Sequence, residues 1–312
     1  MNIQQARHYF PTFPEFRELT FADRDKWEEL IAEYPPVSSI TFGELISWWA
    51  IIGGCKVAQI NENIVISYFL FGDEAQSGLC LIGSKDVDES ICEIFDWQKE
   101  QGKKPKLVHV PEFVLSHVRF PDLYKYSSER ENDECILSSA NFSTLEKLDS
   151  KRRSKIRQFI ASIDESKIAT ESMDLTKPSN QQFLIDLAAR WEDKGGFNKI
   201  ADAETKSFIF AIKHINEIDY KNLCLYINGE IKSFLIFQHT QDPNCVIINY
   251  GRFSYDMPNL FEFAVYQYSK WFEDNGTGSL NIESDLGLAL LRNIKLSMNP
   301  DNFVRKYTIE PK

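Results

Sequence analysis

Two stretches of the sequence share one pattern and decide the fold: residues 57–70 read VAQINENIVISYFL, and residues 224–237 read CLYINGEIKSFLIF. Each stretch is an apolar run, an asparagine-centred turn and a second apolar run. The turn centres at 61–62 and 228–229 tolerate the positive φ that tight turns require. Each stretch therefore predicts a β-hairpin.

The same succession of elements follows both hairpins. A short apolar strand ends in glycine, then a polar loop leads into a segment with apolar residues at helical spacing, and a further strand follows. These strands are expected at 78–83 and 106–110 in the first half, and at 246–251 and 279–282 in the second. Residues 135–137, Cys-Ile-Leu, read as a last strand of the first half. Helical patterns also precede each hairpin, so the sequence contains one unit twice.

A chain of 312 residues is long enough for two domains. The duplicated unit places their boundary near residue 140. We expect an α+β (α/β) fold of two tandem domains, residues 1–140 and 141–312. Each should be a mixed, mostly antiparallel sheet flanked by helices.

Composition narrows the class of protein. An apolar fraction of 43% excludes a disordered chain, and a net charge of −11 argues against non-specific coating of nucleic acid. The six cysteines form no Cys-x-x-Cys pair and the five histidines no paired motif, so we expect no metal site. No signal peptide and no apolar run of about 20 residues is present, which favours a cytoplasmic protein without a transmembrane segment.

The element order of each half resembles the GCN5-related N-acyltransferase fold. In that fold a strand, a loop and the N-terminus of a helix build the site for the acyl donor, because helix N-termini favour phosphate. The family's acyl-CoA signature in this loop is Gln/Arg-x-x-Gly-x-Gly/Ala. Neither loop here contains it, and the second one begins at Arg252 as RFSYDMP.

The C-terminal segment carries a more specific resemblance. Residues 281–295 read NIESDLGLALLRNIK, and Pro300 and the stretch FVRKY at 303–307 follow. This segment resembles the closing motif of bacterial proteins that share the C-terminal domain of phosphatidylglycerol lysyltransferase and are similar to the Fem aminoacyltransferases. The stretch KRRSKIRQF at 151–159 is similar to that family's Lys-Lys-Arg-Asn…Phe helix, with Ser154 in place of asparagine.

The resemblance implies an acyl- or aminoacyl-transferase whose active site lies in the C-terminal domain, while the N-terminal domain is degenerate. The donor would be an acyl-CoA or an aminoacyl-tRNA, and no cofactor would be covalently bound. The acceptor would be an amine or hydroxyl of a small molecule or a lipid head group, which allows a place at the inner face of the membrane. The alternative is a non-catalytic ligand-binding protein that retains the fold. The oligomeric state stays open.

Three residues are the candidates for catalysis. Glu283 and Asp285 alternate along an extended segment where a strand gives way to a helix, so both point to one side. A carboxylate there could accept the proton of an attacking amine or hydroxyl, or bind an aminoacyl ammonium. Alternatively, Asp285 caps the following helix and Glu283 forms a structural ion pair. Tyr250, which precedes the second loop, is a candidate proton donor to the leaving group, or a core residue.

Cationic side chains are the candidates for holding the donor's phosphates. Arg292 and Lys295 are three residues apart and so share a helix face. Arg153 belongs to the basic run at 151–157, which could steer an anionic partner. The alternative for each is a solvated surface charge. The full set of candidate donor-binding residues is Arg153, Arg252, Arg292, Lys295 and Lys306.

Overall fold

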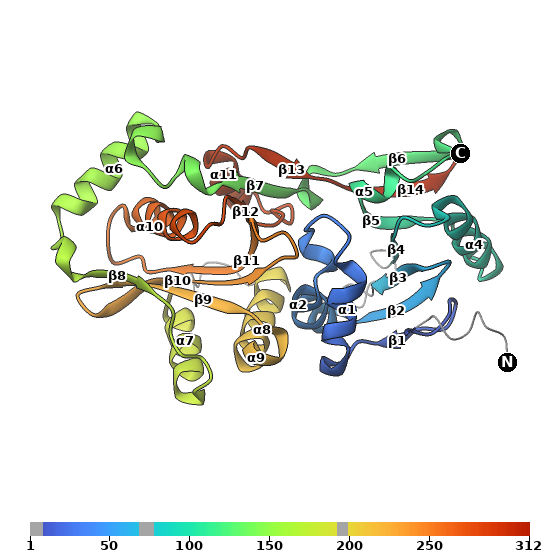
Figure 1. The fold of residues 1–312 in the computed structure, drawn as a ribbon, viewed down its shortest axis with the longest axis horizontal. Coiled ribbons are helices and arrows are strands. Elements are labelled where there is room, and N and C mark those ends of the chain that lie inside the picture. Colours follow the sequence, from blue (N-terminus) through green and yellow to red (C-terminus); the bar gives the residue numbers. More distant parts are fainter. Residues whose placement is uncertain (1–8, 69–77, 192–198) are drawn as a thin grey trace. The chain divides into compact units, whose positions relative to one another are not determined.

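A computed structural model describes residues 9–68, 78–191 and 199–312 of the chain (Figure 1). Its contacts divide the chain into two compact units. Unit 1 consists of Met1–Glu134, Ser284–Arg292 and Phe303–Lys312, and unit 2 consists of Cys135–Glu283 and Asn293–Asn302. The strands form two seven-stranded sheets, one in unit 1 and the other built mainly by unit 2; Glu134 of β7 and Phe303 and Val304 of β13 belong to unit 1.

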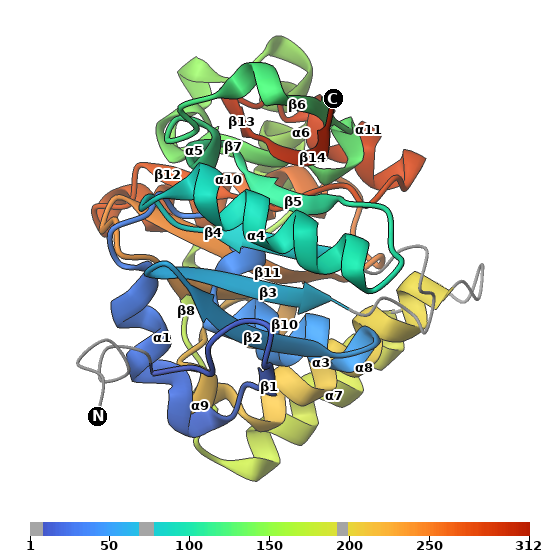
Figure 2. The same ribbon diagram turned by 90° about the vertical axis from the view of Figure 1, so that its right-hand side faces the viewer.

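The sheet of unit 1 has the strand order β1-β2-β3-β4-β5-β14-β6. Its strands are β1 (Arg17–Glu18), β2 (Cys55–Ile60), β3 (Asn63–Tyr68), β4 (Gly78–Ile82), β5 (Leu107–Pro111), β6 (Tyr124–Ser128) and β14 (Lys306–Pro311). Its helices are α1 (Arg24–Ile31), α2 (Phe42–Glu44), a π-helical turn (Leu45–Trp49), α3 (Ala50–Ile52), α4 (Val87–Glu100) and α5 (Glu112–Leu115). Figure 2 shows α4 in front of this sheet, and α4 buries Ile91 and Ile94 against Val65 and Leu81.

The sheet of unit 2 has the order β13-β7-β12-β11-β10-β9-β8. Its strands are β7 (Glu134–Ser138), β8 (Ile168–Glu171), β9 (Lys221–Ile227), β10 (Glu230–His239), β11 (Cys245–Phe253), β12 (Ser279–Asn281) and β13 (Asn302–Val304). Its helices are α6 (Ser150–Ala161), α7 (Pro178–Trp191), α8 (Lys199–Lys213), α9 (Ile215–Ile218) and α10 (Leu260–Asp274). Helix α11 (Ala289–Ser297) begins in unit 1 and ends in unit 2.

Helices cover both faces of the unit 2 sheet, with α6 and α10 on one face and α7, α8 and α9 on the other (Figure 1). On the α10 face, Phe159 and Phe263 stack with ring centroids 4.5 Å apart. On the α8 face, Phe208 stacks on Phe234 at 5.9 Å. Apolar side chains on both faces explain why strands β9 to β11 read as nearly continuous apolar runs.

Both predicted hairpins are present, and short turns close them as expected. Strands β2 and β3 pair antiparallel around Asn61 and Glu62, with φ of 46° and 67°. Strands β9 and β10 pair around Asn228 and Gly229, with φ of 53° and 80°. Residues 69–70, the end of the first predicted hairpin, lie outside the described residues.

The element order predicted downstream of each hairpin is also confirmed. In each unit a helix follows the third strand, and the next strand pairs parallel to the third: β5 to β4 in unit 1 and β12 to β11 in unit 2. The predicted fold class, two mixed and mostly antiparallel sheets flanked by helices, is therefore correct.

The predicted place of residues 135–137 is wrong. They form β7, but β7 pairs antiparallel with β12 in the second sheet, where Leu137 joins the apolar core of unit 2. The C-terminal strand β14 in turn pairs with β5 in the first sheet, with Tyr307 opposite Val110. Each sheet thus includes a strand from the other half of the chain. A short apolar run predicts a strand without specifying its partner.

Candidate functional site

The candidate site in unit 2 begins where β11 and β12 stop pairing. Their parallel register covers only Cys245 to Ile247 on β11. Just beyond it, Ile248 pairs with Phe237 of β10 and Tyr250 pairs with Ile236, so Asn249 has no partner in the β10–β11 ladder. This is a β-bulge, a device that redirects side chains and is frequent next to active sites.

The bulge changes which way β11 presents its side chains. Ile248 packs into the apolar cluster under α10, whereas Tyr250 packs against Phe208 of α8. In a regular strand, residues two apart would share a face. The extra residue, Asn249, therefore turns the end of β11 over.

Glu283 lies two residues beyond the end of β12 and is held by three groups of unit 2. Its backbone N–H donates to Asn281 Oδ1 at 2.8 Å, and its carbonyl oxygen accepts from the N–H of Cys135 at 3.1 Å. Its side-chain Oε1 accepts from Asn249 Nδ2 at 3.0 Å. The φ of Glu283 is 61°, a left-handed conformation that is uncommon for this residue type. Such backbone persists where surrounding contacts enforce it, and it clusters at functional sites.

Lys295 supports the same segment from α11. Its ammonium group donates to the carbonyl oxygen of Ile282, the residue before Glu283. The side chain is buried, with 8% of the residue exposed. The structure thus places this predicted donor-binding cation against the backbone that presents Glu283.

Asp285, which is buried, forms an ion pair with the partly exposed Arg292 within unit 1. The fully buried carboxylate of Asp285 accepts from Arg292 Nη2 at 2.9 Å and Nε at 3.0 Å, and from the N–H of Gly287 at 3.1 Å. Arg130 Nη1 lies 3.4 Å away, and its guanidinium stacks on Phe303. Burial raises the pKa of Asp285, but the bonds from Arg292 and Gly287 outweigh it, so the pKa lies below its usual value.

Tyr250 and Arg252 both contact α8. The Tyr250 hydroxyl lies 2.6 Å from Ser207 Oγ, and only 5% of the tyrosine is exposed. Arg252 Nη2 donates to both carboxylate oxygens of Glu204, at 2.7 and 2.6 Å, and the guanidinium lies over the ring of Phe208. Both predicted site residues are therefore bonded to protein groups in unit 2.

Lys306, another candidate donor-binding residue, lies inside unit 1. Its ammonium group is 3.0 Å from Oε1 of Glu134, a fully buried carboxylate. Glu134 also accepts from the backbone N–H of Ser38 at 2.9 Å and from its hydroxyl at 2.8 Å. The pair therefore ties the start of β14 to the segment before α2.

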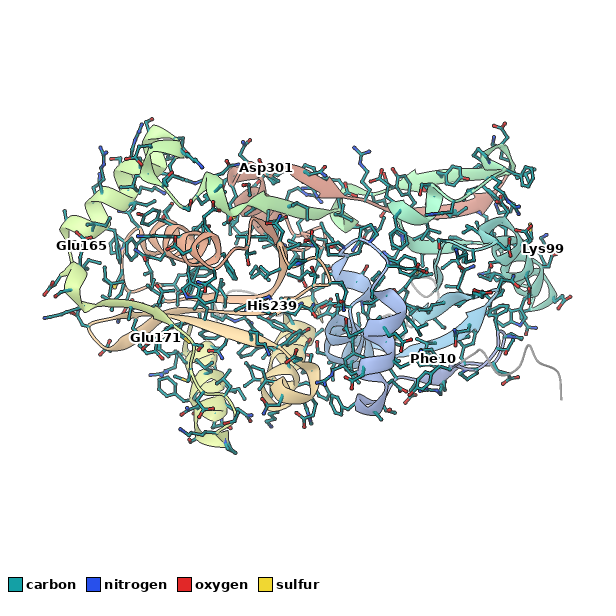
Figure 3. The ribbon with its side chains drawn as sticks, in the orientation of Figure 1. Phe10, Lys99, Glu165, Glu171, His239 and Asp301 are labelled. Carbon is teal, nitrogen blue, oxygen red and sulfur yellow. The ribbon has the colours of Figure 1, made fainter. Side chains whose placement is uncertain are left out.

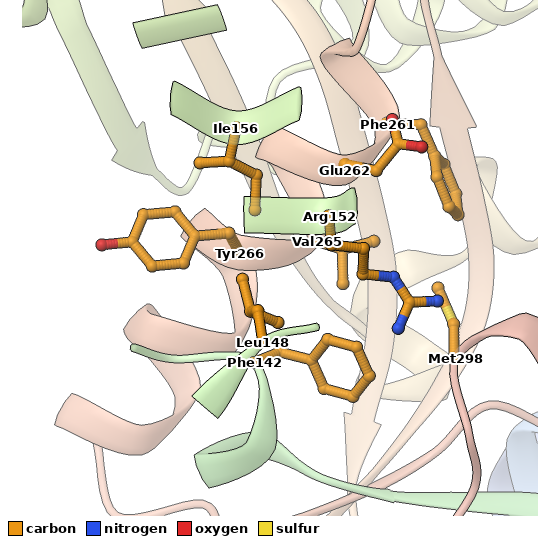
Figure 4. Close-up of a pocket in the computed structure, with 9 residues that line it drawn as sticks. All are labelled: Phe142, Leu148, Arg152, Ile156, Phe261, Glu262, Val265, Tyr266 and Met298. Carbon is orange, nitrogen blue, oxygen red and sulfur yellow. The ribbon is translucent and has the colours of Figure 1, made fainter. Parts of the chain in front are cut away.

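The basic run predicted to be a helix forms α6, and its cations differ in their contacts. Arg152 donates to the carbonyl of Ser297, and Lys155 pairs with Glu262 of α10. Within the described part of the chain, Arg153 forms no side-chain hydrogen bond or ion pair. The same face of unit 2 has a small hollow between α6 and α10, which Figure 4 shows with Arg152 and Glu262 beside apolar side chains.

Asn249 was not among the site residues predicted from the sequence. The available signal was one polar residue inside the apolar run VIINYG at 246–251. Among the residues that the structure describes, no group of three or more metal-ligating side chains gathers. No described helix is both long and apolar enough to cross a membrane.

The family model described as "Phosphatidylglycerol lysyltransferase, C-terminal" matches residues 41–310. A search of curated proteins gives no match.

The solved structures that share the fold include the following three. A conserved protein of unknown function from Bacteroides thetaiotaomicron has a TM-score of 0.78 and 18% sequence identity. The match covers 95% of this chain and 99% of that protein's chain. L-PGS from Bacillus licheniformis has a TM-score of 0.58 and 14% identity, covering 98% and 94%. FemX also has a TM-score of 0.58, with 10% identity, covering 96% and 97%. The predicted resemblance and its tandem acyltransferase-like fold are confirmed.

Proposed function

Because the chain belongs to the family of the phosphatidylglycerol lysyltransferase C-terminal domain, we propose that it transfers an aminoacyl group from a charged tRNA to an amine or hydroxyl acceptor. The reaction is assigned to unit 2, with Glu283 as the general base. One observation carries this assignment: three groups hold Glu283 at the end of β12, in a left-handed backbone conformation. The carboxylate is thus oriented before any substrate binds.

The proposed reaction is a direct acyl transfer. The acceptor's nitrogen or oxygen forms a bond to the aminoacyl carbonyl carbon, and the ester bond from that carbon to the 3′-oxygen of the tRNA breaks. Glu283 takes the acceptor's proton, which then leaves on the 3′-oxygen. The protein contributes orientation of the reactants and one positioned base.

The charges at the start of α10 favour tRNA over CoA as the donor. Near that helix N-terminus, Lys232 pairs with Asp256 at 2.8 Å and Lys155 pairs with Glu262. Arg252, at the end of β11, faces α8 and is bound by Glu204. These cations are engaged by carboxylates, and an acidic residue in the first turn of a helix opposes phosphate there.

A basic surface for the donor is available elsewhere on unit 2. Arg153 is half-buried on α6, and Lys151 and Arg157 beside it are exposed. Positive charge gathered in an acidic chain attracts an anionic partner and raises its rate of association. We assign donor binding to this part of α6.

The other predicted site residues are assigned supporting roles. Each forms a hydrogen bond or ion pair with a partner within its own unit. These contacts favour a role in stabilising the fold over a role in contacting the substrate. They are Tyr250, Arg252, Asp285, Arg292, Lys295 and Lys306. The same observation favours the second candidate, a ligand-binding protein that keeps the fold without the reaction.

Transfer assays with the full chain distinguish the two. The donors are tRNA charged with a mixture of labelled amino acids and, separately, labelled acetyl-CoA; the acceptors are small amines, small alcohols and phosphatidylglycerol vesicles. We expect transfer from tRNA, and a loss of about 100-fold or more in Glu283→Gln, the usual contribution of a general base. The matched control is Glu165→Gln, an exposed glutamate of unit 2 (Figure 3).

Three outcomes would count against the proposal. Transfer from acetyl-CoA alone would overturn the donor. Full activity of Glu283→Gln would overturn the assigned base. No transfer from either donor would favour the ligand-binding alternative.

A further inference from the structure

The side-chain amide of Asn249 has a fixed orientation because of its neighbour. A carboxylate only accepts hydrogen bonds, so the group that faces Glu283 Oε1 at 3.0 Å must be the amide nitrogen. The amide oxygen Oδ1 therefore points away from that oxygen. It is buried from solvent, and no residue in the described part of the chain donates a hydrogen bond to it.

An unpaired buried acceptor is unusual in a folded protein. Most buried polar atoms have a partner, and leaving one without a partner is unfavourable. Here the acceptor lies on a β-bulge that redirects β11, in a run whose other residues are Val246, Ile247, Ile248, Tyr250 and Gly251. An apolar residue would avoid the unpaired oxygen, so the asparagine calls for a hydrogen-bond donor that none of the described residues supplies.

We propose that Asn249 makes this site select amine acceptors over hydroxyl acceptors. The inference rests on the proposed function, because it assigns Asn249 to the acceptor beside Glu283. An attacking primary amine has two hydrogens, one for Glu283 and one for Asn249 Oδ1. An attacking hydroxyl has a single hydrogen. When that hydrogen goes to Glu283, Oδ1 stays unpaired, and sites built to pair a substrate group reject analogues that lack it.

The favoured reaction is then amide formation. The amine nitrogen bonds to the aminoacyl carbonyl carbon, and the ester bond to the tRNA 3′-oxygen breaks. The proton taken by Glu283 leaves on that oxygen, so the products are an amide and a free 3′-hydroxyl. Asn249 keeps one amine hydrogen paired while Glu283 removes the other.

The test compares two small acceptors of nearly equal shape, glycinamide and glycolamide, with charged tRNA and the full chain. The readout is the ratio of kcat/KM for the amine to kcat/KM for the alcohol, in the wild type and in Asn249→Leu. We expect the variant's ratio to be about 10- to 100-fold lower than the wild type's. The control, Asn293→Leu at an exposed position of α11, should keep the wild-type ratio.

The ratio separates substrate contact from positioning. If Asn249 only orients Glu283, both rates fall together and the ratio stays unchanged, which would overturn the proposal. An ordered water as the partner of Oδ1 would give the same unchanged ratio.

A binding measurement keeps the inference testable apart from catalysis and from the folding of the variant. Calorimetry with the wild type should show tighter binding of glycinamide than of glycolamide. Equal binding, or tighter binding of the alcohol, would overturn the selectivity. If the amine binds more tightly but no transfer occurs, the proposed reaction fails while the selectivity stands. If transfer occurs with equal kcat/KM for the two acceptors, the proposed reaction stands and the selectivity fails.

Discussion

Replacing Arg292 by alanine should destabilise unit 1 by about 2 kcal/mol. The substitution removes two hydrogen bonds, at 2.9 and 3.0 Å, from a carboxylate with no exposed surface. Removing one partner of a buried ion pair costs roughly 3–5 kcal/mol. Two features reduce that figure here: Arg130 remains 3.4 Å from Asp285, and the Arg292 side chain is 35% exposed.

Thermal and urea unfolding, followed by circular dichroism, measure this loss. At roughly 2–4 °C per kcal/mol for a unit of this size, the melting temperature should fall by about 4–8 °C. A double-mutant cycle with Asp285→Ala should give a coupling of about 1–2 kcal/mol. Arg157→Ala, an exposed position on α6, is the control and should change stability by less than about 0.5 kcal/mol.

If Arg292→Ala unfolds like the wild type and shows no coupling to Asp285, this ion pair does not stabilise unit 1 and the prediction is wrong. If that variant also lost aminoacyl transfer, Arg292 would contact the donor, as its sequence position first suggested. A destabilised variant with normal transfer at low temperature would support the structural assignment.

Three further predictions concern other parts of the chain. Lys306→Met should destabilise unit 1 by roughly 3 kcal/mol, because it removes the ammonium group that pairs with the buried carboxylate of Glu134. Adding Glu134→Gln should recover part of the loss in urea unfolding, and equal stability of the single and double variants would contradict this. Burial lowers the pKa of His109 from 6.5 to about 4, so between these pH values the unfolded chain binds the proton more tightly than the folded chain. The contribution of His109 to stability should therefore be complete above pH 6.5, and the free energy of unfolding should fall by up to about 3 kcal/mol as the pH falls toward 4. His109→Asn should lack that part of the pH dependence, and unchanged curves would refute it. Arg153→Ala should weaken tRNA binding and lower the slope of log affinity against log salt by about 1 in filter-binding assays, whereas an unchanged slope would remove Arg153 from the donor surface.

Local patterns were enough to predict the repeated architecture. Asparagine-centred turns between apolar runs identified both hairpins, because positive φ at 61–62 and 228–229 is a local requirement. The helices and parallel strands that follow were likewise visible in apolar spacing. These features depend on neighbours a few residues away.

The sequence did not predict which distant strands and charged side chains pair with each other. Nothing in the Cys-Ile-Leu run at 135–137 indicates that β7 pairs with β12, and Asp285 meets Arg130 from a segment more than a hundred residues earlier. The bulge at Asn249 was also not predicted, and it changes the candidate site because it turns Tyr250 and Arg252 toward α8. A regular alternation cannot predict where an extra residue enters a strand.

The most direct test of the central claim is a single-turnover measurement of aminoacyl transfer from charged tRNA to glycinamide by the full chain. The wild type should form the amide at a rate about 100-fold or more above that of Glu283→Gln, while both proteins bind the tRNA equally. Equal rates in the two proteins would contradict the role assigned to Glu283 and, with it, the site built around the end of β12.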